Sequence, residues 1–226
     1  MGVGYNQYFC PISRGAEIFA TRWTPVIVRN LLLGASTFSE LRTGAPGIPR
    51  SLLAERLGRL EQLGIVERKP NPERKRGWLY EMTPAGRDLE SVVEALGIWG
   101  ARWLDAAPTE LEPTVLLWAI CKAMDRERMP EERVVVQFNL RDAPTRRFWI
   151  LVQRPEPEVC PNPPGFDNDL VVTSDTEWLA KWYMGRISLG SAMHARRITV
   201  EGPKRLVREL SKWGGVTPFA GVAPAR

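Results

Sequence analysis

The stretch from Pro46 to Gly86 constrains the fold most, because a helical pattern, a glycine and a hairpin pattern follow one another there. Between Pro49 and Leu63, apolar residues recur at spacings of four and three, which places them on one face of a helix: Leu53, Leu57, Leu60 and Leu63. Gly64 follows, where a left-handed residue commonly ends a helix. The opposite face is small or polar and is free to contact another surface; it carries Ser51, Ala54, Glu55, Gly58, Arg59 and Gln62.

Two extended segments, Ile65–Lys69 and Trp78–Met82, follow this helix, and prolines and a glycine between them predict a hairpin tip. Cations outnumber acids in the hairpin; the basic residues are Arg68, Lys69, Arg74, Lys75 and Arg76. A helix with a small polar face beside a basic hairpin suits duplex DNA, because the helix can read base edges while the hairpin contacts phosphates. The alternative is a solvated helix next to a charged surface loop.

Shorter signals precede this stretch and complete a domain pattern. Ser13 is a candidate helix cap, and Thr24, followed by a proline, predicts the start of a second helix that Gly34 ends. Thr37–Leu41 predicts a brief extended piece and a capped helix, which a turn over Gly44–Pro49 joins to the next helix. The order helix, helix, turn, helix, hairpin is that of a winged helix-turn-helix domain.

Four segments, RWTPVIVRNLLLG, TFSELR, PGIPRSLLAERLGRLEQLGIVER and LYEMTPAG, together resemble the HxlR family of bacterial winged-helix regulators, over roughly Cys10 to Trp103. Members of that family are DNA-binding dimers. The resemblance implies that the side chains facing the groove are Arg50, Ser51, Glu55 and Arg59. It implies phosphate contacts for Lys69, Arg74, Lys75 and Arg76. One departure is that Leu79 precedes Tyr80, where the family usually has a glutamate.

Thr83-Pro84 predicts the start of another helix, with a wide apolar stripe made of Leu89, Val92, Val93, Leu96, Trp99 and Trp103. In the family this helix joins the dimer interface, whereas the pattern alone is equally consistent with packing on its own domain. A dimer places two recognition helices about one helical turn, roughly 34 Å, apart. A homodimer on a two-fold symmetric operator is therefore expected.

The three cysteines, Cys10, Cys121 and Cys160, are widely spaced and no apolar leader precedes them, which favours a reducing compartment. No apolar run approaches the roughly 18 residues of a membrane span. We expect a soluble, cytoplasmic protein without a membrane partner. Some relatives of the HxlR type sense oxidants or electrophiles with a cysteine before the first helix, and Arg14 and the helix start would favour a Cys10 thiolate. The alternative is that Cys10 is an unreactive residue that only packs against its neighbours.

A chain of 226 residues is long for one domain, and its pattern changes after Asp105–Pro113. We expect an α+β protein with a winged-helix domain at 1–106, a linker at 107–113 and a second domain at 114–226. In the second domain the pattern predicts a small sheet covered by helices. The expected elements are a helix at 115–124, a hairpin at 134–152, a strand at 170–173, a helix at 175–184 with a capping box of Ser174 and Glu177, a strand at 197–201 and a helix at 204–213.

Residues 169–210 resemble the sterol carrier protein 2 (SCP2) fold, through a strand, a capped helix ending in Gly185, a small-residue segment with Ala192 and a strand that runs into Gly202. The resemblance implies an apolar cavity and a lipid-like hydrophobic small molecule. The candidate lining residues are Val136, Phe138, Trp149, Ile150, Trp178, Trp182, Met184 and Met193. The same residues are equally suited to filling a core.

His194 is the only histidine, which excludes a metal site with several histidines and argues against a Ser-His-Asp triad. We therefore expect no enzyme, no cofactor and no metal. The sequence predicts a dimeric transcription factor whose DNA affinity a hydrophobic small molecule modulates. Two rivals remain: a redox regulator switched through Cys10 with the second domain as a scaffold, and a lipid-binding protein whose winged helix mediates protein contact.

Overall fold

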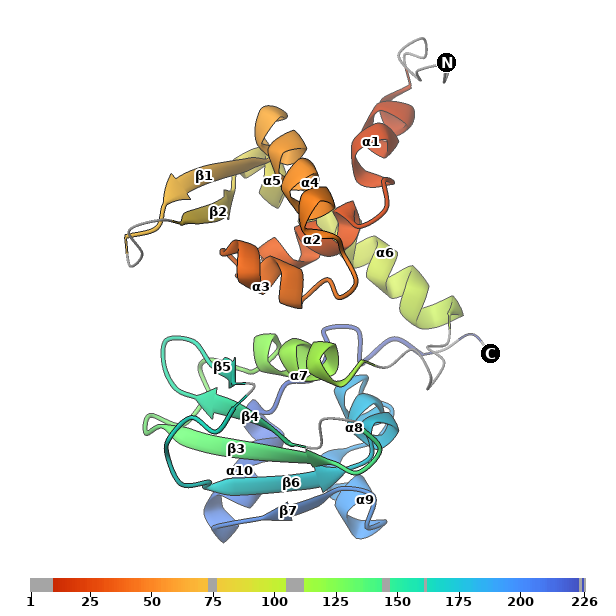
Figure 1. Ribbon diagram of the computed structural model, residues 1–226. Coiled ribbons are helices and arrows are strands. Elements are labelled where there is room, and N and C mark those ends of the chain that lie inside the picture. The colour runs from red at the N-terminus through yellow and green to blue at the C-terminus, as the bar shows by residue number, and fades with distance from the viewer. Residues whose placement is uncertain are drawn as a thin grey trace. The chain divides into compact units, whose positions relative to one another are not determined.

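The computed structural model describes residues 10–72, 77–104, 112–143, 147–160, 162–223 and 225. Contacts divide the chain into two compact units, Met1–Gly97 and Ile98–Arg226 (Figure 1). This division falls inside a helix, and residues 105–111, which include most of the expected linker at 107–113, lie outside the described residues. The domain limits 1–106 and 114–226 stay a prediction. Among the described residues, no helix is both long and apolar enough to cross a bilayer.

The first unit is a winged helix-turn-helix, as the sequence predicts. Its elements are α1 (Pro11–Phe19), α2 (Thr24–Leu32), α3 (Phe38–Thr43), α4 (Arg50–Gln62), β1 (Val66–Pro70), β2 (Trp78–Met82), α5 (Pro84–Arg87) and the start of α6 (Glu90–Trp103). β1 and β2 pair antiparallel, with Val66 opposite Met82 and Pro70 opposite Trp78. A further bridge, which was not predicted, joins Thr37 to Leu79, and beside it the Tyr80 amide donates to the Ser36 carbonyl at 2.7 Å.

Two predicted helix starts in this unit are wrong. The N-cap of α1 is Cys10 rather than Ser13, because Pro11 has no amide hydrogen and is favoured at the first helical position. The N-cap of α2 is Trp23, with φ of 78°, so Thr24 is already helical. The Thr24 hydroxyl lies 2.7 Å from the Thr21 hydroxyl instead of capping.

The caps of α3 and α5 are confirmed. Thr37 and Glu40 form a capping box at α3, and the Thr83 hydroxyl accepts from the Gly86 amide at 3.1 Å. The prediction of one continuous helix after Thr83 is nevertheless wrong. The structure has two helices there, because α5 ends at Arg87 and α6 begins at Glu90. Gly86 is required here: a Cβ at this position would collide with the Ile65 carbonyl oxygen, against which the turn packs.

The second unit is a five-stranded sheet with helices, which matches the expected α+β class. It contains the end of α6 and α7 (Pro113–Lys122), β3 (Val134–Leu140), β4 (Arg147–Val152), β5 (Glu158–Cys160), β6 (Leu170–Ser174), α8 (Thr176–Tyr183), α9 (Leu189–His194), β7 (Thr199–Glu201) and α10 (Lys204–Trp213). The strand order is β5-β4-β3-β6-β7, with β3 and β6 parallel and the other pairs antiparallel. The short edge strand β5 was missed, and β7 is shorter than the expected 197–201.

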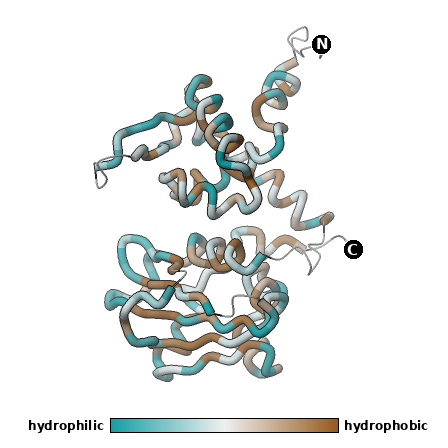
Figure 2. The backbone as a smooth tube through the Cα atoms, viewed as in Figure 1, coloured by the Kyte–Doolittle hydropathy of each residue, from teal (hydrophilic) through white to brown (hydrophobic). Residues whose placement is uncertain are grey.

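One face of this sheet carries the main apolar core. Side chains from α7, α8, α9 and α10 pack against alternate residues of the central strands, such as Val136 and Phe138. Figure 2 shows hydrophobic residues along α7 and these strands. The opposite face carries a smaller cluster of Val135, Trp149 and Leu151. Beside it, hydrogen bonds link side chains in series, in the order Trp149, Asn168, Gln137, Asn139 and Thr173.

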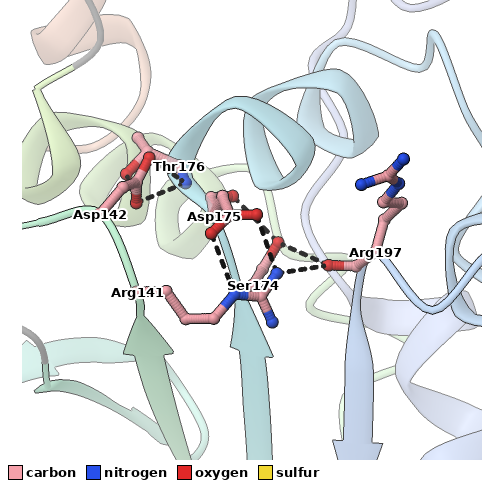
Figure 3. A network of polar contacts seen from close by, with 6 residues as sticks. All are labelled: Arg141, Asp142, Ser174, Asp175, Thr176 and Arg197. Atoms are coloured by element: carbon pink, nitrogen blue, oxygen red, sulfur yellow. Dashed lines mark hydrogen bonds and ion pairs between the residues drawn. The ribbon is translucent and has the colours of Figure 1, made fainter.

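The expected capping box of Ser174 and Glu177 is wrong. Both carboxylate oxygens of Asp142 accept from the Thr176 amide, at 2.9 and 3.0 Å, so a residue far away in the sequence caps α8 (Figure 3). Glu177 instead pairs with Lys181 at 2.6 Å. Next to this cap, two hydrogen bonds from Arg141, at 2.9 and 2.8 Å, hold the pKa of the Asp175 carboxyl below its ordinary range.

Candidate nucleic-acid interface

The buried and exposed faces of α4 follow the predicted periodicity. Leu53, Leu57 and Leu60 are fully buried against the core of the first unit. Leu63, the fourth member of the predicted stripe, is the C-cap and is partly exposed, and Gly64 follows with φ of 68°. The four predicted groove residues are all exposed, namely Arg50, Ser51, Glu55 and Arg59. The helix thus presents its polar face outward on a fixed apolar base.

These four residues divide into two pairs. Arg50 is the first residue of α4, and its guanidinium lies 5.7 Å from the centroid of the Phe38 ring. Glu55 and Arg59 line a hollow of about 510 Å³, which α4 shares with Glu17 and Thr21. Arg50 and Ser51 do not line this hollow. The structure therefore leaves the N-terminal pair open and places the second pair beside α1.

The two described cations of the hairpin, Lys69 and Arg68, both lie beside carboxylates. The ammonium of Lys69 lies 2.8 Å from a Glu81 oxygen and 2.9 Å from a Glu67 oxygen, and these hydrogen bonds raise the pKa of Lys69. Its charge is compensated by two carboxylates, which weakens the expected attraction to a phosphate. The Arg68 guanidinium lies 3.4 Å from a Glu61 oxygen of α4 and 4.4 Å from the Trp78 ring centroid. The other three predicted phosphate contacts lie outside the described residues: Arg74, Lys75 and Arg76.

Cys10 is exposed at the start of α1. Hydrogen bonds from the Ser13 backbone amide and hydroxyl lower the pKa of the Cys10 thiol, and the Ile12 amide adds to the effect. The helix start is thus the source of the shift, as predicted. Arg14, the other expected source, is not among its causes.

We expect Cys10 to react with iodoacetamide at a lower pH than an ordinary cysteine, because a larger fraction of it is thiolate near neutral pH. The measurement is the alkylation rate against pH, followed by mass spectrometry of each cysteine peptide. Cys121 is the internal control: burial raises the pKa of its thiol to about 12, so it should stay unlabelled in the folded protein. A Cys10 midpoint at the free-cysteine value of about 8.5 would contradict the assignment.

Six of the eight predicted ligand-lining residues lie in or against one apolar cluster. Val136, Phe138, Ile150 and Trp182 belong to the core of the second unit, and Trp178 and Met193 pack against it. Met184 is partly exposed at the end of α8. Trp149 lies on the opposite face of the sheet with Val135 and Leu151. The structure therefore does not bring Trp149 together with the other candidates.

Sequence reasoning missed Trp213. Its side chain is 1% exposed at the end of α10, and its indole Nε1–H has no acceptor among the described residues. A buried indole donor usually has a partner, because leaving it without one costs free energy. No sequence signal marks such a residue, since it depends on which groups surround the ring.

The HxlR-like helix-turn-helix family model matches residues 18–108. The uncharacterized HTH-type transcriptional regulator YvaP of Bacillus subtilis (strain 168) is 33% identical over 97 residues, which cover 42% of this chain and 90% of YvaP. The HTH-type transcriptional regulator YodB of the same strain is 33% identical over 104 residues, which cover 46% of this chain and 93% of YodB. The solved structure of the redox regulator HypR in its reduced form is 27% identical, covers 40% of this chain and 90% of HypR, and has a TM-score of 0.38.

Proposed function

Because the chain belongs to the HxlR-like helix-turn-helix family of DNA-binding transcriptional regulators, we propose that it acts as a cytoplasmic homodimer on a two-fold symmetric operator. The observation that carries this proposal is α4, whose leucine face is buried while Arg50 and Ser51 stand open at its first turn. Residues in the first turns of such a helix reach base edges in the major groove, and the adjacent hairpin reaches phosphates.

The exposed apolar face of α6 supports the dimer. None of its residues is buried, and four large ones are between 43% and 54% exposed: Val92, Leu96, Trp99 and Trp103. A contiguous apolar face of this kind commonly marks an interface between proteins. A second copy covers it in our proposal, so that the two α4 helices contact equivalent half-sites. We assign no catalytic role to the chain.

We further propose that the second unit is similar to the SCP2 fold and binds a hydrophobic ligand. Trp213 supports it, because a carbonyl or hydroxyl oxygen of an amphipathic molecule would accept from its buried Nε1–H. The apolar cluster around Trp182 and Phe138 would contact the rest of such a molecule. The ligand would alter DNA affinity only by binding one arrangement of the dimer better than another.

A redox regulator switched through Cys10 is the second candidate, and the exposure and lowered pKa of this thiol favour it. In that case oxidation of Cys10 changes DNA affinity and the second unit serves as a scaffold. Replacing Cys10 by serine distinguishes the two candidates: an unchanged response of DNA binding to oxidant in the variant would eliminate this one.

The test of the main proposal is selection of duplexes from a random pool, followed by native mass spectrometry of the complex. We expect recovered sites with two inverted half-sites about one helical turn apart, and a mass equal to two chains and one duplex. In the absence of DNA, the measured mass of the protein should exceed that of the chain by the mass of a retained apolar ligand. Recovery of no preferred sequence would contradict the regulator, and a single chain on each duplex would contradict the dimer.

A further inference from the structure

The outward face of α10 in the second unit is strongly basic. Its exposed residues are Lys204, Arg205, Arg208, Ser211 and Lys212, whereas Leu206, Leu210 and Trp213 are buried. At about 100° per residue, the four cations fall within an arc of about 100° on the side away from the core. We call these four cations the α10 stripe.

The charge of the α10 stripe is not compensated by acids. None of its four side chains forms an ion pair with a carboxylate of the described residues, and Glu209 is the one acid on the helix. The Arg208 Nε–H donates to the Lys204 carbonyl at 3.3 Å, which leaves the positive charge in place. Arg141, Lys181 and Arg126 of the same unit are, by contrast, each paired with a carboxylate.

The sequence around this helix is also rich in cations. The formal charge of the whole protein is +5. The segment 194–213, which contains α10, holds six Lys and Arg residues against two glutamates, Glu201 and Glu209. Four of these six cations form the α10 stripe, so positive charge is localised on one face of this helix, as expected for a contact with a polyanion.

We propose that the α10 stripe binds the phosphate backbone of duplex DNA that flanks the operator held by α4. This inference rests on the proposed function, because α4 brings the duplex close and so raises the local concentration of phosphates. The stripe fits DNA rather than a protein, because Ser211 is the only other exposed side chain on the helix. Protein interfaces normally have an apolar or aromatic centre, which this face lacks. Phosphate contacts add affinity and salt dependence without base preference.

The test is a variant in which all four cations are neutralised, K204Q/R205Q/R208Q/K212Q, compared with the unaltered protein on a duplex that extends beyond the selected operator. The slope of log affinity against log salt falls by about 0.9 for each phosphate that the protein no longer neutralises. If three cations of the stripe bind phosphates, the slope should fall by about 2.7 for each protomer. The preferred sequence should not change. On a duplex trimmed to the operator, the two proteins should bind with similar slopes.

The control for total charge removes four positive charges elsewhere in the second unit, in the variant R126Q/R128Q/R133Q/R147Q, all at exposed positions. Arg126 and Arg128 are each paired with a carboxylate, so this variant tests the loss of net charge rather than the loss of unpaired cations. Glutamine is a good helix former, and thermal melting checks that both variants fold. An equal fall in slope for both variants, or no fall for the stripe variant, overturns the inference. If the unaltered protein binds no duplex at all, the proposed function fails. If the unaltered protein binds DNA and the stripe variant has the same salt slope, only the inference about the α10 stripe fails.

Discussion

Replacement of Trp99 by glutamate should convert the dimer to monomers and lower operator affinity by at least about 100-fold. Trp99 is 54% exposed at the centre of the apolar face of α6, so a carboxylate there is well solvated in the monomer. In a dimer the same carboxylate is buried without a partner, and two such charges meet across a symmetric interface. Each unpaired buried charge costs several kcal/mol. Sedimentation equilibrium and titration of the selected operator measure the two effects.

The matched control is Phe166→Glu. Phe166 is 46% exposed in the second unit and is far from α6 in the sequence. The Arg133 guanidinium carbon lies 3.5 Å from the centroid of its ring. This variant receives the same charge at a similarly exposed aromatic position, so it should remain a dimer and keep its DNA affinity. Dimers of Trp99→Glu with unchanged affinity would show that another surface joins the two copies. Unfolding of both variants in urea at the same midpoint as the unaltered protein excludes a folding defect.

The recognition helix and the hairpin could be predicted from the sequence because local patterns determine them. The spacing of Leu53, Leu57 and Leu60 sets the buried face of α4 whatever packs against it, and Gly64 marks the helix end. The hairpin follows from the prolines and glycine between two short extended segments. The same local signals were ambiguous at helix starts, where Pro11 moved the cap of α1 to Cys10.

Features that depend on contacts between distant residues could not be predicted. Asp142 caps α8 from 34 positions away, and a nearby Ser174 and Glu177 offered a simpler local pattern. The compensation of Lys69 by Glu81 depends on the pairing of β1 with β2, which brings the two residues together across the hairpin. The sequence shows the charges of the hairpin, whereas the strand pairing decides which of them remain available to a phosphate.

Strand geometry separates two residues of the expected ligand-lining set, Trp149 and Ile150. Adjacent strand residues point to opposite faces of a sheet, so Trp149 and Ile150 could not both face the same cavity. The structure places Ile150 in the main core and Trp149 in the smaller cluster on the other face. The buried indole N–H of Trp213 has no acceptor among the described residues. This could not be predicted from the sequence, because it depends on which groups surround the ring in the folded protein.

Arg50→Ala should lower affinity for the selected operator by about 10- to 100-fold and relax sequence preference at one position of each half-site. A side chain that contacts a base edge contributes about 1–3 kcal/mol of discrimination, and Arg50 stands open at the first turn of α4. Arg59→Ala is the matched variant on the same helix. Because Arg59 lines the hollow beside α1, its removal should change operator preference less than the removal of Arg50. Competition against duplexes mutated at each position measures both.

Neutralising the hairpin cations in R74Q/K75Q/R76Q should act differently from Arg50→Ala. Phosphates carry no sequence information, so affinity should fall on operator and random duplex alike. The salt slope should fall by about 2.7 for each protomer if all three cations bind phosphates. Arg50→Ala should lower the slope by no more than about 0.9, the value for a single phosphate. If the triple variant changed sequence preference while Arg50→Ala lowered binding evenly on all duplexes, the roles of helix and hairpin would be reversed, and α4 would no longer be the reading element.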